Sequence, residues 1–208
     1  MVFRAMAERA FFDSGAKGRA TAAIKTVEAQ TSCEIVISVR HSCGSYRAAD
    51  LTLGAVFAMT SLAVMIYSPR PFRSAAIPLD VAIAFGVGML ASWLLPALRR
   101  LLNGTARVRE SVDSAAKTAF YDLGIAKTHR RQGILVFASM LEKRCKLVAD
   151  VGVTATDVLA KSEVALQQTI ARRDFDAFVA AVEALGPLLG ARLPHKEGDE
   201  NELPDEMQ

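Results

Sequence analysis

Four acidic residues lie where a predicted helix or strand begins or ends, and carboxylates in such places could do chemistry. Asp150 follows a predicted strand, Glu34 begins another, Asp122 lies near the end of a helix and Asp13 precedes one. Carboxylates at adjacent strand ends could converge on a hard cation such as Ca²⁺ or Mg²⁺, which needs several oxygen ligands. A cation held in this way can activate water for hydrolysis. The alternative is that each acid caps a helix or carries a solvated charge.

No complete catalytic motif accompanies these acids, so the catalytic residues stay unassigned. The chain has no phosphate loop, Ser-His-Asp order, HExxH sequence or dinucleotide fingerprint. His129 lies within a basic stretch, residues 127–131, which is typical of a solvated or lipid-facing loop. The cysteines form no CxxC pair and therefore predict neither a zinc site nor a disulfide framework. They are Cys33, Cys43 and Cys145.

Two uncharged apolar stretches, Leu51–Tyr67 and Val81–Leu98, interrupt the elements that carry these acids. A helix that spans a bilayer needs roughly 20 mostly apolar residues, with a range of about 17–25. The segment between the stretches is too short to recross a membrane, so we expect an antiparallel transmembrane hairpin. The alternative, a pair of buried core helices, is disfavoured because such helices usually carry a polar face. The pairs Gly54/Ala58 and Gly88/Ser92 have the small-residue spacing of close helix contacts in lipid.

Arginines beside the two stretches predict the topology of the hairpin. Two lie in the connecting loop and six lie in the outer flanks, and basic residues in short flanking segments mark the cytoplasmic side. The loop residues are Arg70 and Arg73, and the flanking residues are Arg40, Arg47, Arg99, Arg100, Arg107 and Arg109. We therefore expect a multi-pass protein of the cell (inner) membrane with both termini in the cytoplasm. Its partners would be the lipid bilayer and a membrane protein, but not nucleic acid, because no dense Lys/Arg run interleaves with aromatic residues.

The remaining elements predict a small layered α/β domain that the hairpin interrupts. Helical spacing over 16–30 precedes the β-branched run Glu34–Arg40, and a further helix from Thr105 to Gly124 precedes two short strands, Ile134–Ala138 and Cys145–Ala149. A lone strand cannot satisfy its backbone groups, so Glu34–Arg40 should pair with the later strands in one sheet. The predicted parts are 1–47, the hairpin 48–98, 99–192 and an acidic tail 193–208, for which we expect disorder or loose docking.

Several of these segments resemble the TPM domain, a family named from thylakoid-lumen, photosystem-II repair and nematode receptor-accessory proteins. The turn into the first strand, residues 31–37 (TSCEIVI), is similar to the family's T-G-x-I pattern. Residues 133–139 (GILVFAS) and 142–152 (EKRCKLVADVG) resemble its later strand pair. The interruption by a hairpin looks like a bacterial membrane-anchored subgroup. The sequence departs from the pattern at Ser32 and Cys33, and it lacks a tryptophan in the helix after Gly152.

The resemblance implies two different functions. Some members of the family are accessory proteins that help to assemble, repair or regulate membrane complexes, and the family is also named for a proposed acid-phosphatase activity with a divalent cation in an acidic pocket. For this chain we expect a cytoplasmic accessory module that binds a membrane protein partner. The alternative is a phosphatase assisted by a divalent metal, in which Asp150, Glu34, Asp122 and Asp13 would be the metal ligands.

Overall fold

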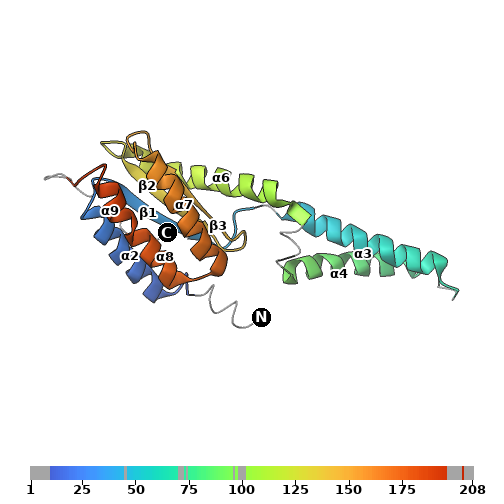
Figure 1. Ribbon diagram of the computed structural model, residues 1–208. Coiled ribbons are helices and arrows are strands. Elements are labelled where there is room, and N and C mark those ends of the chain that lie inside the picture. The colour runs from blue at the N-terminus through green and yellow to red at the C-terminus, as the bar shows by residue number, and fades with distance from the viewer. Residues whose placement is uncertain are drawn as a thin grey trace. The chain divides into compact units, whose positions relative to one another are not determined.

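A computed structural model describes residues 10–44, 46–69, 73, 75–95, 97, 102–195 and 203. The chain divides into two compact units: Met1–Cys43 together with Glu110–Gln208, here called the α/β unit, and Gly44–Arg109, here called the hairpin unit. The ribbon in Figure 1 shows the elements of both units. The protein is thus of mixed α and β structure, as the sequence predicts.

The α/β unit is built on a three-stranded sheet with the order β1-β2-β3. Strand β1 (Glu34–Arg40) is parallel to β2 (Gly133–Ser139), and β2 is antiparallel to β3 (Arg144–Ala149). The predicted pairing of all three strands in one sheet is confirmed. The two later strands start one residue earlier than predicted, because Gly133 and Arg144 already lie in register with their neighbours.

Helices cover both faces of this sheet, which is why its central strand is entirely buried. One face carries α2 (Ser14–Glu28), α7 (Thr156–Arg172), α8 (Phe175–Glu183) and α9 (Leu185–Gly190), all in front of the sheet in Figure 1. The alternate β-branched residues of the strands point into this layer. They include Ile35, Ile37, Ile134 and Val136.

The opposite face of the sheet packs against α6 (Thr105–Asp122). The later turns of α6 place Val112, Ala116 and Phe120 against Leu135 and Phe137 of β2. After α6, Gly124 adopts a left-handed conformation (φ 71°) and the short 3-10 helix η1 (Ile125–Lys127) leads toward β2. The sequence did not predict η1.

The parallel pairing of β1 and β2 requires a crossover connection, because a tight turn joins only antiparallel strands. Here the whole hairpin unit and α6 form that connection, since both lie between Arg40 and Gly133 in the chain. Strand β1 leaves the sheet at the end where β2 also ends. The chain therefore departs toward the hairpin unit from the carboxyl end of the parallel pair.

The hairpin unit consists mainly of α3 (Arg47–Tyr67) and α4 (Ile77–Leu94), which pack along each other. Both helices are long and apolar enough to cross a membrane. Their close contacts pair Asp50 with Ser92 and Leu53 with Gly88, so the two helices are antiparallel.

Candidate functional site

The structure places the four predicted metal ligands at separate points of the α/β unit. Glu34 lies opposite Gly133, and the N–H of Asp150 donates to the carbonyl of Gly133 from the other side. Glu34 and Asp150 therefore share one end of the sheet but belong to the two outer strands, roughly 10 Å apart for two strand spacings.

The other two acids are exposed on helices. Asp122 is the last residue of α6, and Asp13 precedes the first residue of α2. Glu28 is the last residue of α2 and accepts the N–H of Ile35, so this end of the helix lies beside the start of β1. Asp13 lies before the other end of the helix, about 22 Å away along its axis. Within the described part of the chain, no three His, Cys, Asp or Glu residues form a group that could hold a metal ion. The cation site remains a prediction of the sequence.

Asp150 is held by Arg131 in a bidentate ion pair. The Oδ2 atom accepts from Nε of Arg131 at 2.7 Å and Oδ1 accepts from Nη2 at 3.0 Å, while the N–H of Val151 donates to Oδ1 at 2.7 Å. The Asp150 side chain is only 3% exposed, whereas that of Arg131 is 53% exposed. Burial by itself raises the pKa of Asp150, but the hydrogen bonds from Arg131 and Val151 and the charge of Arg131 outweigh it and leave that pKa below its ordinary value.

The backbone around this pair is shaped to bring the guanidinium to the carboxylate. Arg131 adopts a left-handed conformation (φ 55°), and its carbonyl accepts the N–H of Gly152 at 2.8 Å. A Cβ on Gly152 would lie 2.5 Å from the carbonyl oxygens of Arg130 and Arg131, so only glycine fits this close approach. The counter-charge beside Asp150 in this structure is therefore a side chain of the same chain.

A second polar cluster, which the sequence did not predict, lies at the opposite end of the sheet. Ser139 closes β2 and donates from Oγ to Oε2 of Glu142 in a short hydrogen bond. The N–H of Cys43 donates to Oε1 of the same carboxylate at 3.1 Å. Ser139 and Glu142 are 0% and 3% exposed, so the carboxylate is compensated by hydrogen bonds rather than by solvent.

The thiol of Cys43 belongs to this cluster, and its surroundings make it a weak acid. Burial is the largest cause and, together with the nearby charge of Glu142, raises the pKa of Cys43 to about 11, against a smaller opposing effect of the neighbouring Ser139 hydroxyl. A thiol with this pKa is almost entirely protonated at neutral pH and is a poor nucleophile. The cluster thus connects Cys43, the last residue before the hairpin unit, to the β2–β3 turn. These hydrogen bonds stabilise the fold.

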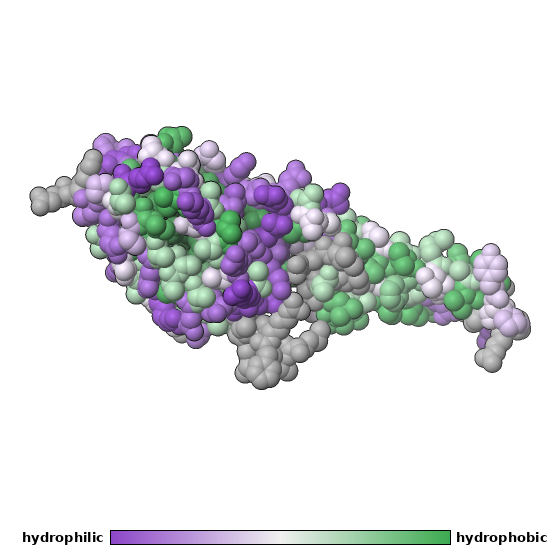
Figure 2. Space-filling view, viewed as in Figure 1, coloured by the Kyte–Doolittle hydropathy of each residue, from purple (hydrophilic) through white to green (hydrophobic). Residues whose placement is uncertain are grey.

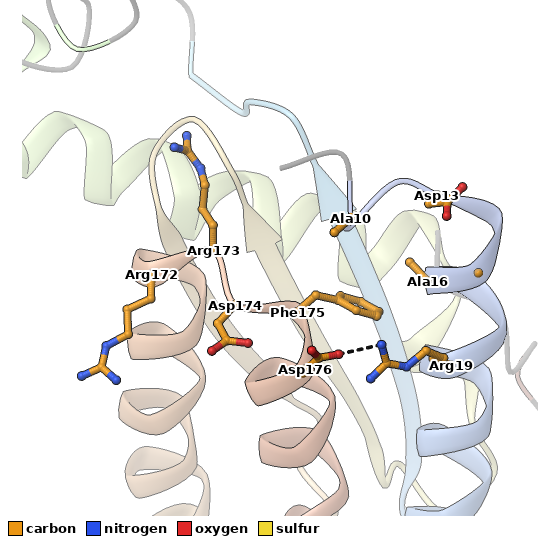
Figure 3. Close-up of a pocket in the computed structure, with 10 residues that line it drawn as sticks. Ala10, Asp13, Ala16, Arg19, Arg172, Arg173, Asp174, Phe175 and Asp176 are labelled. Carbon is orange, nitrogen blue, oxygen red and sulfur yellow. Dashed lines mark ion pairs between the residues drawn. The ribbon is translucent and has the colours of Figure 1, made fainter. Parts of the chain in front are cut away.

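An open groove of about 620 Å³ lies where the start of α2 meets the α7–α8 junction (Figure 3). Three of its charged side chains make contacts within the groove or cap a helix. Arg19 pairs with Asp176 at 2.6 Å and lies over the ring of Phe175, and the Asp174 side chain caps α8 by accepting the N–H of Ala177. In Figure 3, Arg172 and Arg173 point away from Phe175. The groove therefore has mixed charge and no side chains that converge on one ligand.

The hairpin unit presents the largest apolar surface among the described residues, and much of it is green in Figure 2. Only 17% of the apolar window of α3 and 11% of that of α4 are buried, so most large side chains of both helices point outward. Those more than half exposed are Leu51, Val56, Met59, Val64, Ile66, Tyr67, Leu79, Ile83, Leu90, Trp93 and Leu94. An exposed apolar surface of this extent marks an interaction with lipid or with another apolar surface.

The buried side of the hairpin combines small residues, Leu53 and one polar pair. A Cβ on Gly88 would lie 2.6 Å from the carbonyl oxygen of Leu53, and one on Gly54 would lie 2.8 Å from the ring of Phe85. Ser92 is fully buried and donates from Oγ to Oδ1 of Asp50 at 2.6 Å. Three of the four small residues that the sequence analysis paired by spacing thus lie at or beside the helix contact.

Comparisons with known proteins place the chain by its fold. No family model and no curated protein sequence matches it. A solved structure with a similar fold is the NMR structure of the BA42 protein from the psychrophilic bacterium Bizionia argentinensis, with a TM-score of 0.56 and 16% sequence identity over 94% of this chain and 93% of that chain. At this identity the likeness concerns the fold alone.

Proposed function

We propose that the protein is a membrane-anchored accessory protein in which α3 and α4 cross the bilayer and the α/β unit binds a membrane protein partner at the cytoplasmic surface. The exposed apolar surface of the hairpin is the observation that carries this proposal. At 1.5 Å per residue, the 21 residues of α3 extend about 32 Å and the 18 of α4 about 27 Å, close to the roughly 30 Å of a hydrocarbon core.

The contact between α3 and α4 has the features that helix pairs need in lipid. Two helices in lipid associate through close backbone packing and through polar side chains that satisfy each other. Gly54 and Gly88 allow the close packing, and Asp50 and Ser92 supply the polar contact. Asp50 lies in the first turn of α3, where a carboxylate can reach the headgroups.

An accessory role is favoured because two buried carboxylates, one at each end of the sheet, are held by groups of the protein itself. Asp150 is paired with Arg131, and Glu142 accepts from Ser139 and Cys43. Such groups stabilise a scaffold that presents its outer helices to a partner. The two-to-six distribution of arginines supports a cytoplasmic position for both termini.

Topology reporters test the membrane part of the proposal. A reporter fused after Gln208 should be active in the cytoplasm, and one inserted near Ser74 should be active on the other side. An exported C-terminal reporter would contradict the topology, and release of the full chain by alkaline carbonate would contradict the anchor.

Affinity purification from native membranes tests the accessory part. The full chain should retain a membrane protein partner, and turnover of a generic phosphate ester should be absent with or without Ca²⁺ or Mg²⁺. Metal-dependent turnover that Asp150→Asn abolishes would favour the phosphatase alternative instead.

A further inference from the structure

The outer edge of β3 is where the sheet could accept another strand. β3 has β2 on one side and ends the strand order on the other. The N–H of Asp150 points toward β2, since it donates to Gly133. Because bonding alternates along an antiparallel pair, the N–H groups of Cys145 and Leu147 point away from β2. An uncovered row of such groups is a template for pairing with another chain.

Two side chains of α7 occupy the positions that the backbone of a fourth strand would fill. Gln167 accepts the N–H of Cys145 through Oε1 at 2.9 Å and donates from Nε2 to the carbonyl of Lys143 at 2.7 Å. Its carboxamide thus provides both the acceptor and the donor of a peptide group. One helical turn earlier, Glu163 accepts the N–H of Leu147 through Oε2 at 3.1 Å.

The spacing of the two elements explains why this arrangement works. Glu163 and Gln167 are four residues apart on a helix, a rise of about 6 Å. Cys145 and Leu147 are two residues apart on a strand, a rise of about 6.7 Å. Leu159, Ser162 and Leu166 are buried and fix the position of α7. The side chains of Glu163 and Gln167 are therefore held opposite the N–H groups of Leu147 and Cys145.

Lys146 adds a charge to the same edge. Its Nζ lies 3.0 Å from Oε1 of Glu163, and its side chain is 33% exposed. Lysine on an outer strand opposes pairing of that strand with an identical one, because the two positive charges would be brought together.

We propose that Glu163, Gln167 and Lys146 form an edge lock that keeps β3 from pairing with β3 of a second copy of this chain. A second copy is the relevant partner because it carries the same strand, and two such strands can pair antiparallel about a two-fold axis. The lock is independent of the proposed function, since it rests on contacts within the α/β unit.

The experiment compares variants of the full chain in detergent micelles over a range of protein concentrations. The triple variant Glu163→Ala/Gln167→Ala/Lys146→Thr should associate at least tenfold more tightly than the wild type by analytical ultracentrifugation. Its Cys145 and Leu147 amides should exchange rapidly with solvent when dilute and slowly when concentrated. The control Val164→Ala/Gln168→Ala alters exposed positions of the same helix and should behave as the wild type.

Two further variants keep the test decisive if the triple variant does not fold. Glu163→Gln retains Lys146 and both acceptors and should stay unassociated, whereas Glu163→Ala alone should speed exchange of Leu147 at least tenfold and leave Cys145 unchanged. Unchanged exchange of Leu147 in Glu163→Ala would overturn the lock. So would a folded triple variant that does not associate, or one that associates while both amides exchange rapidly.

Discussion

Ser92 in α4 donates a hydrogen bond to Asp50 in α3, with 2.6 Å between Oγ and Oδ1. Substituting Ser92→Ala removes this hydrogen bond from the helix contact and should destabilise the hairpin by about 0.6 kcal/mol, the average for such bonds between membrane helices, and by about 1.7 kcal/mol at most. The measurement is the mole fraction of SDS at which half of the purified protein has lost the contact between α3 and α4. Thr60→Ala is the control, because the Thr60 hydroxyl bonds only the carbonyl of Val56 in its own helix turn and is exposed. Equal shifts in the two variants would show that the Asp50–Ser92 pair contributes nothing specific.

Gly88 and Gly86 provide a matched pair of substitutions on α4. A methyl group at Gly88 would meet the Leu53 carbonyl at 2.6 Å, whereas one at Gly86 would meet nothing within 4 Å. Gly88→Ala should therefore force the helices apart and cost about 1–3 kcal/mol. Gly86→Ala should be neutral or slightly stabilising, because alanine favours helix more than glycine. The same SDS titration measures both, and a larger loss in Gly86→Ala would contradict the helix contact.

The Arg131–Asp150 pair predicts how stability depends on pH. Because the folded-state pKa of Asp150 is below its ordinary value, the pair stabilises the folded state above the unfolded pKa, about 3.9. This contribution is lost as the pH falls through the lower folded pKa. Asp150→Asn should therefore lower Tm at pH 7 and flatten the acid side of the curve of Tm against pH. Arg131→Gln should do the same, and the double variant should lose less than the sum of the two. Additive losses would show that the groups are not coupled.

Calcium distinguishes the ion pair from the cation site that the sequence suggested. Both carboxylate oxygens of Asp150 already accept hydrogen bonds from Arg131. We therefore expect millimolar Ca²⁺ to leave Tm unchanged in the wild type and in Asp150→Asn. A rise in Tm of the wild type that Asp150→Asn abolishes would support the metal-ligand hypothesis instead, since a ligand that binds only the folded state stabilises it.

The Cys43 thiol reports on the buried Ser139–Glu142 cluster. With a pKa of about 11, its thiolate is a very small fraction at pH 8, so alkylation by iodoacetamide should be slow. Glu142→Gln removes the negative charge beside the thiol and should speed alkylation of Cys43 severalfold, as measured by peptide mass spectrometry. Glu183→Gln changes an exposed carboxylate on α8 and should have no effect. An unchanged alkylation rate in Glu142→Gln would show that the charge of Glu142 does not affect the Cys43 thiol.

The sheet could be predicted from the sequence because its strands are short β-branched runs with clear boundaries. EIVISVR matches β1 at both ends, and the runs around Leu135 and Leu147 define the other two strands. The direction of the β1–β2 pairing could not be predicted, because alternation of residues does not distinguish parallel from antiparallel neighbours in a strand buried on both faces.

The contact of Cys43 with Glu142 was missed because the two residues are distant in sequence. Glu142 looks like part of a polar turn, and only the fold brings Cys43 to it across 99 positions. The sequence places Asp150 at a strand end as a possible cation ligand, but it does not show that Arg131, 19 positions earlier, pairs with this carboxylate. The polar residues Glu163 and Gln167, four apart on α7, have the spacing of any solvent-facing helix surface, so their contacts with β3 could not be predicted.

The parallel pairing of β1 with β2 also dictates an order of events during synthesis. Strand β1 ends at Arg40 and its neighbour begins at Gly133, with both apolar helices between them. At about 5–20 residues per second, the ribosome needs on the order of 5–20 s to add that segment. Throughout this time α2 and β1 have no sheet to join, while α3 and α4 emerge one after the other. The sheet can close only after the hairpin unit is made, so α2 and β1 lack their neighbouring strands until β2 and β3 have been synthesised.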